Sequence, residues 1–130
     1  MIRVNIIAWH NGGGLSRDVD ILVDALPADQ FDITLNGTPV GEAGVLKRRI
    51  YHRMANARRL ALDKRALAAS SYDINLFLED IVPGFFRYAR ANAFIPNPEW
   101  FKSAQVRHLR ALDAVLCKTR SAEESFDAFG

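Results

Sequence analysis

The chain has 130 residues, of which 49% are hydrophobic and 25% are charged, and its formal net charge is +2. This length suits one compact domain, and the composition excludes a chain that is disordered throughout. The small net charge gives no indication of nucleic acid as a partner. No apolar run approaches the roughly 18 residues of a membrane span, and Arg3 and Asn5 interrupt the apolar start, so we expect a cytoplasmic protein without a signal peptide.

The chain opens with the pattern of a strand, a glycine loop and a helix. Residues 2–8 (IRVNIIA) form a mostly apolar run rich in β-branched side chains, which predicts a buried strand. After the glycines, apolar residues recur at helical spacing over residues 15–26, with Asp18 and Asp20 expected in the first turn of that helix. Residues 31–39 (FDITLNGTP) predict a second short strand that ends in a turn.

The long segment 45–69 predicts a basic helix. It has no proline or glycine, and it holds eight lysines and arginines but only Asp63 among the acidic residues. Such a helix is most often a solvated face whose cationic side chains cover alanine and leucine. The functional alternative is attraction to an anionic membrane surface. Nucleic acid is the weaker choice, because the aromatic residues lie in other segments.

The second half of the chain predicts three more strands, with helices between and after them. The expected elements are a strand in DINLFLED (73–80), a short aromatic helix at 85–91, a strand in NAFIP (92–96), a helix at 98–112, a strand in DAVLCKT (113–119) and a helix with Ser121 as N-cap and Glu124 in its capping box. Strands that alternate with helices indicate right-handed βαβ units. We therefore predict an α/β fold: a single Rossmann-like domain over residues 1–130, with a parallel sheet of about five strands and helices on both faces.

Polar and glycine residues follow the predicted strands at the positions where each strand ends. Ligands of open parallel sheets bind beyond the carboxyl ends of the strands, so these residues predict a binding site at one edge of the sheet. The candidates are His10, Gly12, Gly13 and Gly14 after the first strand, Glu79 and Asp80 after the third, Asn97 and Glu99 after the fourth, and Lys118 and Thr119 after the fifth.

The catalytic candidates are Glu79, Asp80 and His10, and the others are candidates for substrate binding; several of both kinds have a structural explanation as well. One of Glu79 and Asp80 would suit a general base, but a solvated strand end explains both carboxylates equally well. His10 could take part in acid–base chemistry at neutral pH, although a histidine beside a glycine loop more often bonds to the backbone. Glu99 is explained more simply as a favourable charge in the first turn of a helix. Lys118 could bind a phosphate or be solvated.

The glycine loop differs from the known cofactor loops. A dinucleotide fingerprint needs a third glycine where Arg17 stands, and a carboxylate at the end of the second strand, which is absent. No Walker lysine follows the glycines, and no metal-ligand spacing occurs. We therefore expect neither a cofactor nor a metal. The loop could still donate backbone N–H groups to an anion or a hydroxyl group, or it could be a tight turn only.

Three stretches together suggest a family. The glycine loop after the first strand, the stretch NLFLEDIVPGFFRYARANAFIPNPEWF and the stretch LDAVLCKTRSAEESF resemble the N-terminal half of a glycosyltransferase of the two-Rossmann-domain (GT-B) type. The resemblance covers most of the chain and is most specific in FLED, IPNPEWF and DAVLCKT, whereas residues 37–71 add little to it.

The resemblance implies that two domains bind the two substrates. The N-terminal domain would mainly bind the acceptor and supply the glycine loop, and a C-terminal domain would mainly bind the nucleotide sugar. It also implies site residues in this chain: Gly12, Gly13 and Gly14 near the transferred sugar or the donor phosphates, and Glu79, Asp80, Asn97 and Glu99 facing the acceptor or the cleft.

We therefore expect the acceptor-side domain of an enzyme that transfers sugar from a nucleotide sugar to a cell-surface polysaccharide or glycolipid. No second domain follows residue 130, so we expect a piece of a longer enzyme, and little or no transferase activity from this chain alone. Two alternatives stay open. One is a non-catalytic binding or scaffold module whose basic helix docks an anionic membrane, at the inner membrane face; the other is an independent nucleotide-binding α/β protein.

Overall fold

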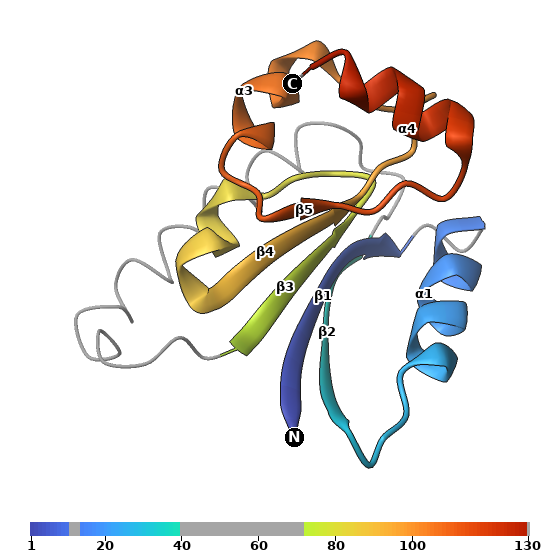
Figure 1. Cartoon of the computed structure of the whole chain (residues 1–130). Helices are drawn as coiled ribbons and strands as arrows, with labels where there is room; N and C mark the ends of the chain where they lie inside the picture. The colour runs from blue at the N-terminus through green and yellow to red at the C-terminus, as the bar shows by residue number, and fades with distance from the viewer. Residues whose placement is uncertain (11–13, 40–71, 130) are drawn as a thin grey trace.

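A five-stranded parallel sheet forms the centre of the protein (Figure 1). The structure, a computed structural model, describes residues 1–10, 14–39 and 72–129. The strands lie in the order β2-β1-β3-β4-β5. Their bounds are β1 (Ile2–His10), β2 (Phe31–Pro39), β3 (Tyr72–Leu78), β4 (Ala89–Ile95) and β5 (Ala114–Val115). The order reverses at β1 and β3, because the chain passes from β1 to β2 on one side and returns to β3 on the other.

Helices cover both faces of this sheet. They are α1 (Gly14–Ala25), η1 (Pro83–Tyr88), η2 (Ser103–Gln105), α3 (Val106–Leu109) and α4 (Arg120–Asp127), of which η1 and η2 are 3₁₀ helices. Val19 and Leu22 of α1 pack on one face, while Phe85 of η1 and Phe126 of α4 pack on the other. The predicted Rossmann-like α/β fold is therefore confirmed. None of the helices in the described part of the chain is long and apolar enough to cross a membrane.

Successive side chains of each strand point to opposite faces of the sheet, and this divides the core into two layers. Val4, Ile6 and Ala8 of β1 face α1, and Ile7 faces the opposite layer. The layer opposite α1 is rich in aromatic side chains, and several of its ring pairs meet edge to face, as Phe94 and Phe126 do. The buried members of the α1 layer are Val4, Ile6, Ala8, Val19, Leu76, Leu78 and Ala93, and those of the other are Ile7, Phe77, Ile81, Val82, Phe85, Phe94 and Phe126.

A row of asparagine side chains crosses the aromatic layer from strand to strand. Asn36 of β2 donates to the side-chain oxygen of Asn5 in β1, and Asn5 donates to Asn75 of β3 at 2.8 Å. Asn75 donates in turn to Asn92 of β4 at 2.9 Å and to the Phe85 carbonyl at 2.7 Å. Asn5 and Asn75 are 0% exposed. We call these four side chains the asparagine ladder; its mutual hydrogen bonds offset the cost of burying the amides.

The three helices predicted after residue 80 differ from those observed. The helix expected at 85–91 is η1, which ends at Tyr88 because β4 begins at Ala89. The helix expected at 98–112 is reduced to the short elements η2 and α3. α4 begins at Arg120, because the Thr119 hydroxyl accepts the Ala122 N–H at 3.1 Å, so the prediction of Ser121 as N-cap was wrong. The predicted basic helix at 45–69 lies outside the described residues.

Candidate functional site

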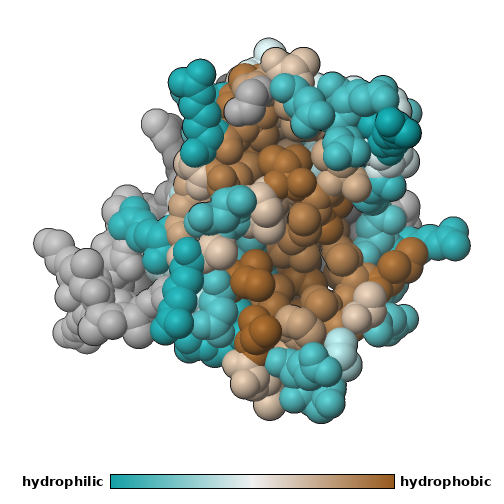
Figure 2. Space-filling view, in the orientation of Figure 1, coloured by the Kyte–Doolittle hydropathy of each residue, from teal (hydrophilic) through white to brown (hydrophobic). Residues whose placement is uncertain are grey.

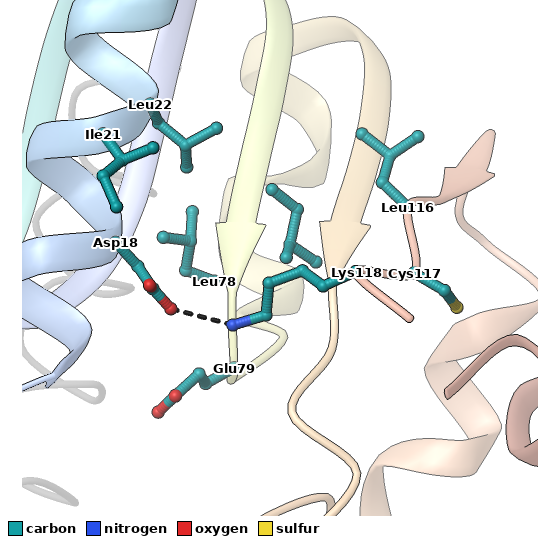
Figure 3. A pocket seen from close by; sticks show the side chains of 9 residues that line it. Asp18, Ile21, Leu22, Leu78, Glu79, Leu116, Cys117 and Lys118 are labelled. Carbon is teal, nitrogen blue, oxygen red and sulfur yellow. Dashed lines mark hydrogen bonds and ion pairs between the residues drawn. The ribbon is translucent and has the colours of Figure 1, made fainter. Parts of the chain in front are cut away.

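A pocket of about 320 Å³ opens at the carboxyl edge of the sheet, on the side that α1 covers (Figure 3). α1 forms one wall, the ends of β3 and β4 form the floor, and the chain after β5 forms the other wall. The lining residues are Asp18, Ile21, Leu22, Leu78, Glu79, Ile95, Leu116, Cys117 and Lys118. This is the edge at which the strand ends predicted a site.

Strand register explains the aliphatic floor. Leu78 and Ile95 lie opposite each other in the pairing of β3 with β4, and both point to the α1 side. Leu116 continues the line of β5, since its N–H donates to the Phe94 carbonyl at 2.7 Å. Leu78 is 2% exposed, whereas Leu116 is 48% exposed and Ile21 of α1 is 55% exposed. The floor is therefore buried protein core, and the upper walls present apolar side chains to solvent.

An ion pair closes one side of the pocket mouth. The Lys118 ammonium lies 2.8 Å from a carboxylate oxygen of Asp18, and the two residues are 100 positions apart in the chain. Both side chains are partly exposed, so the pair contributes about 1 kcal/mol or less to stability. The prediction that Asp18 lies in the first turn of its helix was wrong, because α1 begins at Gly14. Asp18 lies one turn further along and faces Lys118.

Glu79 follows β3 in a conformation that is unfavourable for any residue with a β-carbon. Its φ is +62°, in the left-handed region, which costs roughly 1–2 kcal/mol. The Glu79 N–H donates to the Ile95 carbonyl at 3.0 Å, and the Asn97 side-chain amide donates to its carboxylate at 3.1 Å. These two bonds fix the turn and hold the carboxylate at the pocket mouth.

The other predicted residues after β3, β4 and β5 lie outside the pocket lining. Asp80 is half-buried next to Glu79, and its N–H donates to the Leu78 carbonyl at 2.7 Å. Glu99 is exposed, and its N–H bonds to the Asn97 side chain at 3.3 Å. Thr119 caps α4. Of the candidates at these three strand ends, the structure thus brings together Glu79, Asn97 and Lys118.

The candidates of the glycine loop are only partly described. His10 is the last residue of β1, and Gly14 is the first residue of α1. Gly12 and Gly13 lie outside the described residues. β1 therefore ends at the carboxyl edge of the sheet, as predicted. The role of the glycine loop in binding stays a prediction.

Cys117 contributes to the pocket wall, but its sulfur points away from the ion pair (Figure 3). The side chain packs against the aromatic layer. Burial raises the pKa of the thiol above its ordinary value, and the charges of Glu123 and Asp127 raise it further. The protonated thiol is thus favoured, which does not suit a nucleophile.

Sequence reasoning missed the contribution of α1 to this site. The sequence pattern assigns Leu22 only to the apolar stripe of a helix and Asp18 only to its first turn, and it does not single out Ile21. The helical spacing places Asp18, Ile21 and Leu22 on one face of α1, which would have grouped them. It could not have indicated that Lys118 lies opposite.

The amino edge of the sheet carries charges of a structural kind. Asp73 accepts the Arg3 backbone N–H at 2.8 Å and also pairs with the Arg3 and Arg90 side chains. The Arg3 backbone hydrogen bond is the main reason why the pKa of Asp73 is below its ordinary value, and the Arg3 and Arg90 charges add to the effect. In the described ranges, no group of three or more His, Cys, Asp or Glu residues could hold a metal ion.

The arrangement at the carboxyl edge can bind a ligand with two different parts. Leu78, Ile95 and Leu116 offer apolar surface, and Glu79 offers an oriented hydrogen-bond acceptor beside it. A carboxylate accepts hydrogen bonds from hydroxyl groups, and these charge-assisted bonds are stronger than neutral ones. Comparison of the chain with protein families, with curated proteins and with solved structures found no match in any of the three.

Proposed function

We propose that this chain is the acceptor-side domain of a glycosyltransferase, which passes sugar from a nucleotide sugar to a cell-surface polysaccharide or glycolipid. The observation that carries the proposal is the strained Glu79, whose carboxylate is oriented by Asn97 at the mouth of a pocket at the carboxyl edge. Backbone strain of this kind is concentrated at functional sites, where the surrounding structure maintains it.

In this proposal the chain positions the nucleophile of the reaction. An acceptor hydroxyl passes its proton to the Glu79 carboxylate and attacks the anomeric carbon of a nucleotide sugar that a second domain would hold. The bond from that carbon to the phosphate oxygen breaks, and the nucleoside phosphate leaves with the bonding electrons. Glu79 is the candidate base with a defined place in the pocket. Asp80 and His10 stay candidates for the same role, since Asp80 follows β3 and His10 is the last residue of β1, and both strands end at this edge.

The charge balance of the pocket favours an acceptor over a nucleotide. The positive charge of Lys118 is compensated by Asp18 at 2.8 Å, and Glu79 adds a carboxylate. Among the described lining residues the charges of Asp18, Glu79 and Lys118 thus sum to about −1, which repels phosphate groups. This supports the acceptor-side function over an independent nucleotide-binding protein.

A place at the inner face of the membrane is part of the proposal. Glycolipid acceptors lie there, and the basic segment 45–69 of the sequence has the composition that anionic lipids attract. The scaffold alternative shares this surface and differs from the acceptor-side function in needing no carbohydrate at Glu79.

Amide chemical-shift mapping by NMR tests the proposed function. The protein is titrated with a panel of neutral disaccharides and, separately, with UDP. We expect the disaccharides to shift the amides of Glu79, Asn97 and Lys118, and we expect Glu79→Gln to weaken this binding about tenfold, because a charge-assisted bond becomes a neutral one. Glu124→Gln, on the exposed face of α4, is the matched control and leaves binding unchanged. Shifts at this edge at a lower concentration of UDP than of every sugar would contradict the proposal.

A further inference from the structure

The pocket chemistry points to a more specific acceptor class: we infer that the pocket takes the alkyl chain of a neutral, amphipathic acceptor, a glycolipid and not a free polysaccharide. The inference rests on the proposed function, because it assigns the sugar end of that acceptor to Glu79. It adds a second binding element, the aliphatic floor, which a polysaccharide would leave unused.

The lining of the pocket is aliphatic. Among the lining residues that the structure describes, the apolar side chains other than cysteine are leucines and isoleucines and none is aromatic: Ile21, Leu22, Leu78, Ile95 and Leu116. Nucleic acid bases bind proteins largely by stacking on aromatic faces, which this lining does not supply. Alkyl groups need only apolar surface that is withdrawn from water.

The walls of the pocket carry apolar surface that the fold itself leaves open. Ile21 and Leu116 stand on opposite walls and are both about half exposed, although each lies next to buried core residues. The view in Figure 2 shows a broad band of apolar side chains down the middle of the molecule, with hydrophilic side chains on both sides. Exposed apolar side chains grouped around a cavity are typical of a binding site.

The mouth of the pocket determines the kind of head group. Lys118 is already paired with Asp18, and the Glu79 carboxylate is oriented by Asn97. An anionic head group would meet a lining with one excess negative charge. A hydroxyl-bearing neutral head group can donate to Glu79 instead. The aliphatic floor and the acidic mouth together fit a neutral sugar joined to an alkyl chain.

Isothermal titration calorimetry with n-alkyl β-D-glucosides, from methyl to octyl, tests the inference. All are used below their critical micelle concentrations. We expect affinity to rise about fourfold for each CH₂ that enters the pocket and to level off when the pocket is full. Octyl sulfate, with the same chain and an anionic head, is expected to bind about tenfold more weakly than octyl glucoside.

Two variants distinguish binding in the pocket from non-specific binding to exposed apolar side chains. Leu116→Ser places a hydroxyl in the pocket wall and should flatten the dependence on chain length. Leu35→Ser is the matched control, since Leu35 is 51% exposed and lies outside the pocket on β2; it should leave the dependence unchanged. Both positions are exposed enough for the variants to fold, which urea denaturation verifies.

The outcomes distinguish this inference from the proposed function. Equal affinities of methyl and octyl glucoside, both with shifts at Glu79, would overturn the alkyl-chain inference and leave the acceptor-side function in place. Equal chain-length dependence in Leu116→Ser and the unchanged protein would also overturn it. Tighter binding of octyl sulfate than of octyl glucoside, with no sugar-dependent shift at Glu79, would overturn both. Loss of octyl glucoside binding as the protein self-associates would assign the apolar surface to a second copy of the chain and overturn the inference.

Discussion

At the scale of single residues, Glu79 combines an unfavourable backbone with an oriented side chain. Among the described residues other than glycine, it alone has a positive φ. The Ile95 carbonyl and the Asn97 amide hold it there. Glu79 lines the pocket beyond the point where β3 ends, and Figure 3 shows its carboxylate past the Asp18–Lys118 ion pair as seen from Leu78.

This strain predicts an unusual order of stability between two substitutions. Glu79→Ala and Glu79→Gly both remove the carboxylate, but only glycine removes the β-carbon that makes φ of +62° costly. We expect Glu79→Gly to be more stable than Glu79→Ala by about 1 kcal/mol in urea denaturation. At Glu124, within α4, the same pair should show the opposite order by a similar amount. Alanine more stable than glycine at both positions would contradict the account of Glu79.

Cys117 gives a prediction about pH. Burial, followed by the charges of Glu123 and Asp127, raises the pKa of the thiol above the ordinary value of 9.0. The thiolate is the reactive form, so the rate of alkylation by iodoacetamide should reach its midpoint above pH 9.0 in the folded protein. The urea-unfolded protein should show the ordinary midpoint, and Glu123→Gln should lower the folded midpoint. A folded midpoint at or below the unfolded one would be inconsistent with this environment.

At the scale of elements, the asparagine ladder connects four strands through side chains as well as through the backbone. Asn75 is its centre: it accepts from Asn5 and donates to Asn92 and to the Phe85 carbonyl, so it also ties η1 to the sheet. Asn36 stands at the half-buried end of the row. The ladder forms only when the strands are in this register, which makes it a device for fixing strand alignment.

The ladder predicts unequal costs along its length. Asn75→Leu removes the hydrogen bonds that the Asn5 amide group, the Asn92 side-chain oxygen and the Phe85 carbonyl make to Asn75, and we expect a loss of about 3 kcal/mol or more. Asn36→Ala removes one donor at the partly solvated end and should cost about 1 kcal/mol. Urea denaturation of both variants measures the difference. Similar small losses at the two positions would show that the ladder contributes little.

Local sequence pattern accounts for the strands better than for the helices of the second half. Residues 31–39 form β2, but the turn predicted at the end of this strand was wrong, because residues 36–39 continue the pairing with β1. The prediction of one helix over residues 98–112 was wrong. The structure has only η2 and α3 there, and each is too short to show a helical period in the sequence. Thr119 and Ser121 have similar ability to cap a helix, so the sequence alone does not show at which of them α4 begins. In the structure Thr119 is the N-cap.

At the scale of the whole molecule, the two sides of the sheet differ. The side of η1 and α4 carries the aromatic layer and the asparagine ladder, whereas the side of α1 carries the aliphatic layer and the pocket. Parallel strands place their carboxyl ends at one edge, which is why polar residues after separate strands predicted that Glu79, Asn97 and Lys118 would lie there.

The pocket itself could not be predicted from the sequence. Its ion pair joins Asp18 to Lys118 across 100 positions, and its floor depends on the register that sets Leu78 opposite Ile95. The sequence does contain a signal for the asparagine ladder, because Asn5, Asn75 and Asn92 each interrupt an apolar strand. Polar residues at such positions require partners, but the sequence does not identify them.

The most direct test of the central claim is a crystal structure of the protein with octyl β-D-glucoside. The account predicts an alkyl chain on Leu78, Ile95 and Leu116, and a sugar hydroxyl within hydrogen-bonding distance of the Glu79 carboxylate. A glucoside bound elsewhere while this pocket stays unfilled, or a second copy of the chain seated in the pocket, would contradict it.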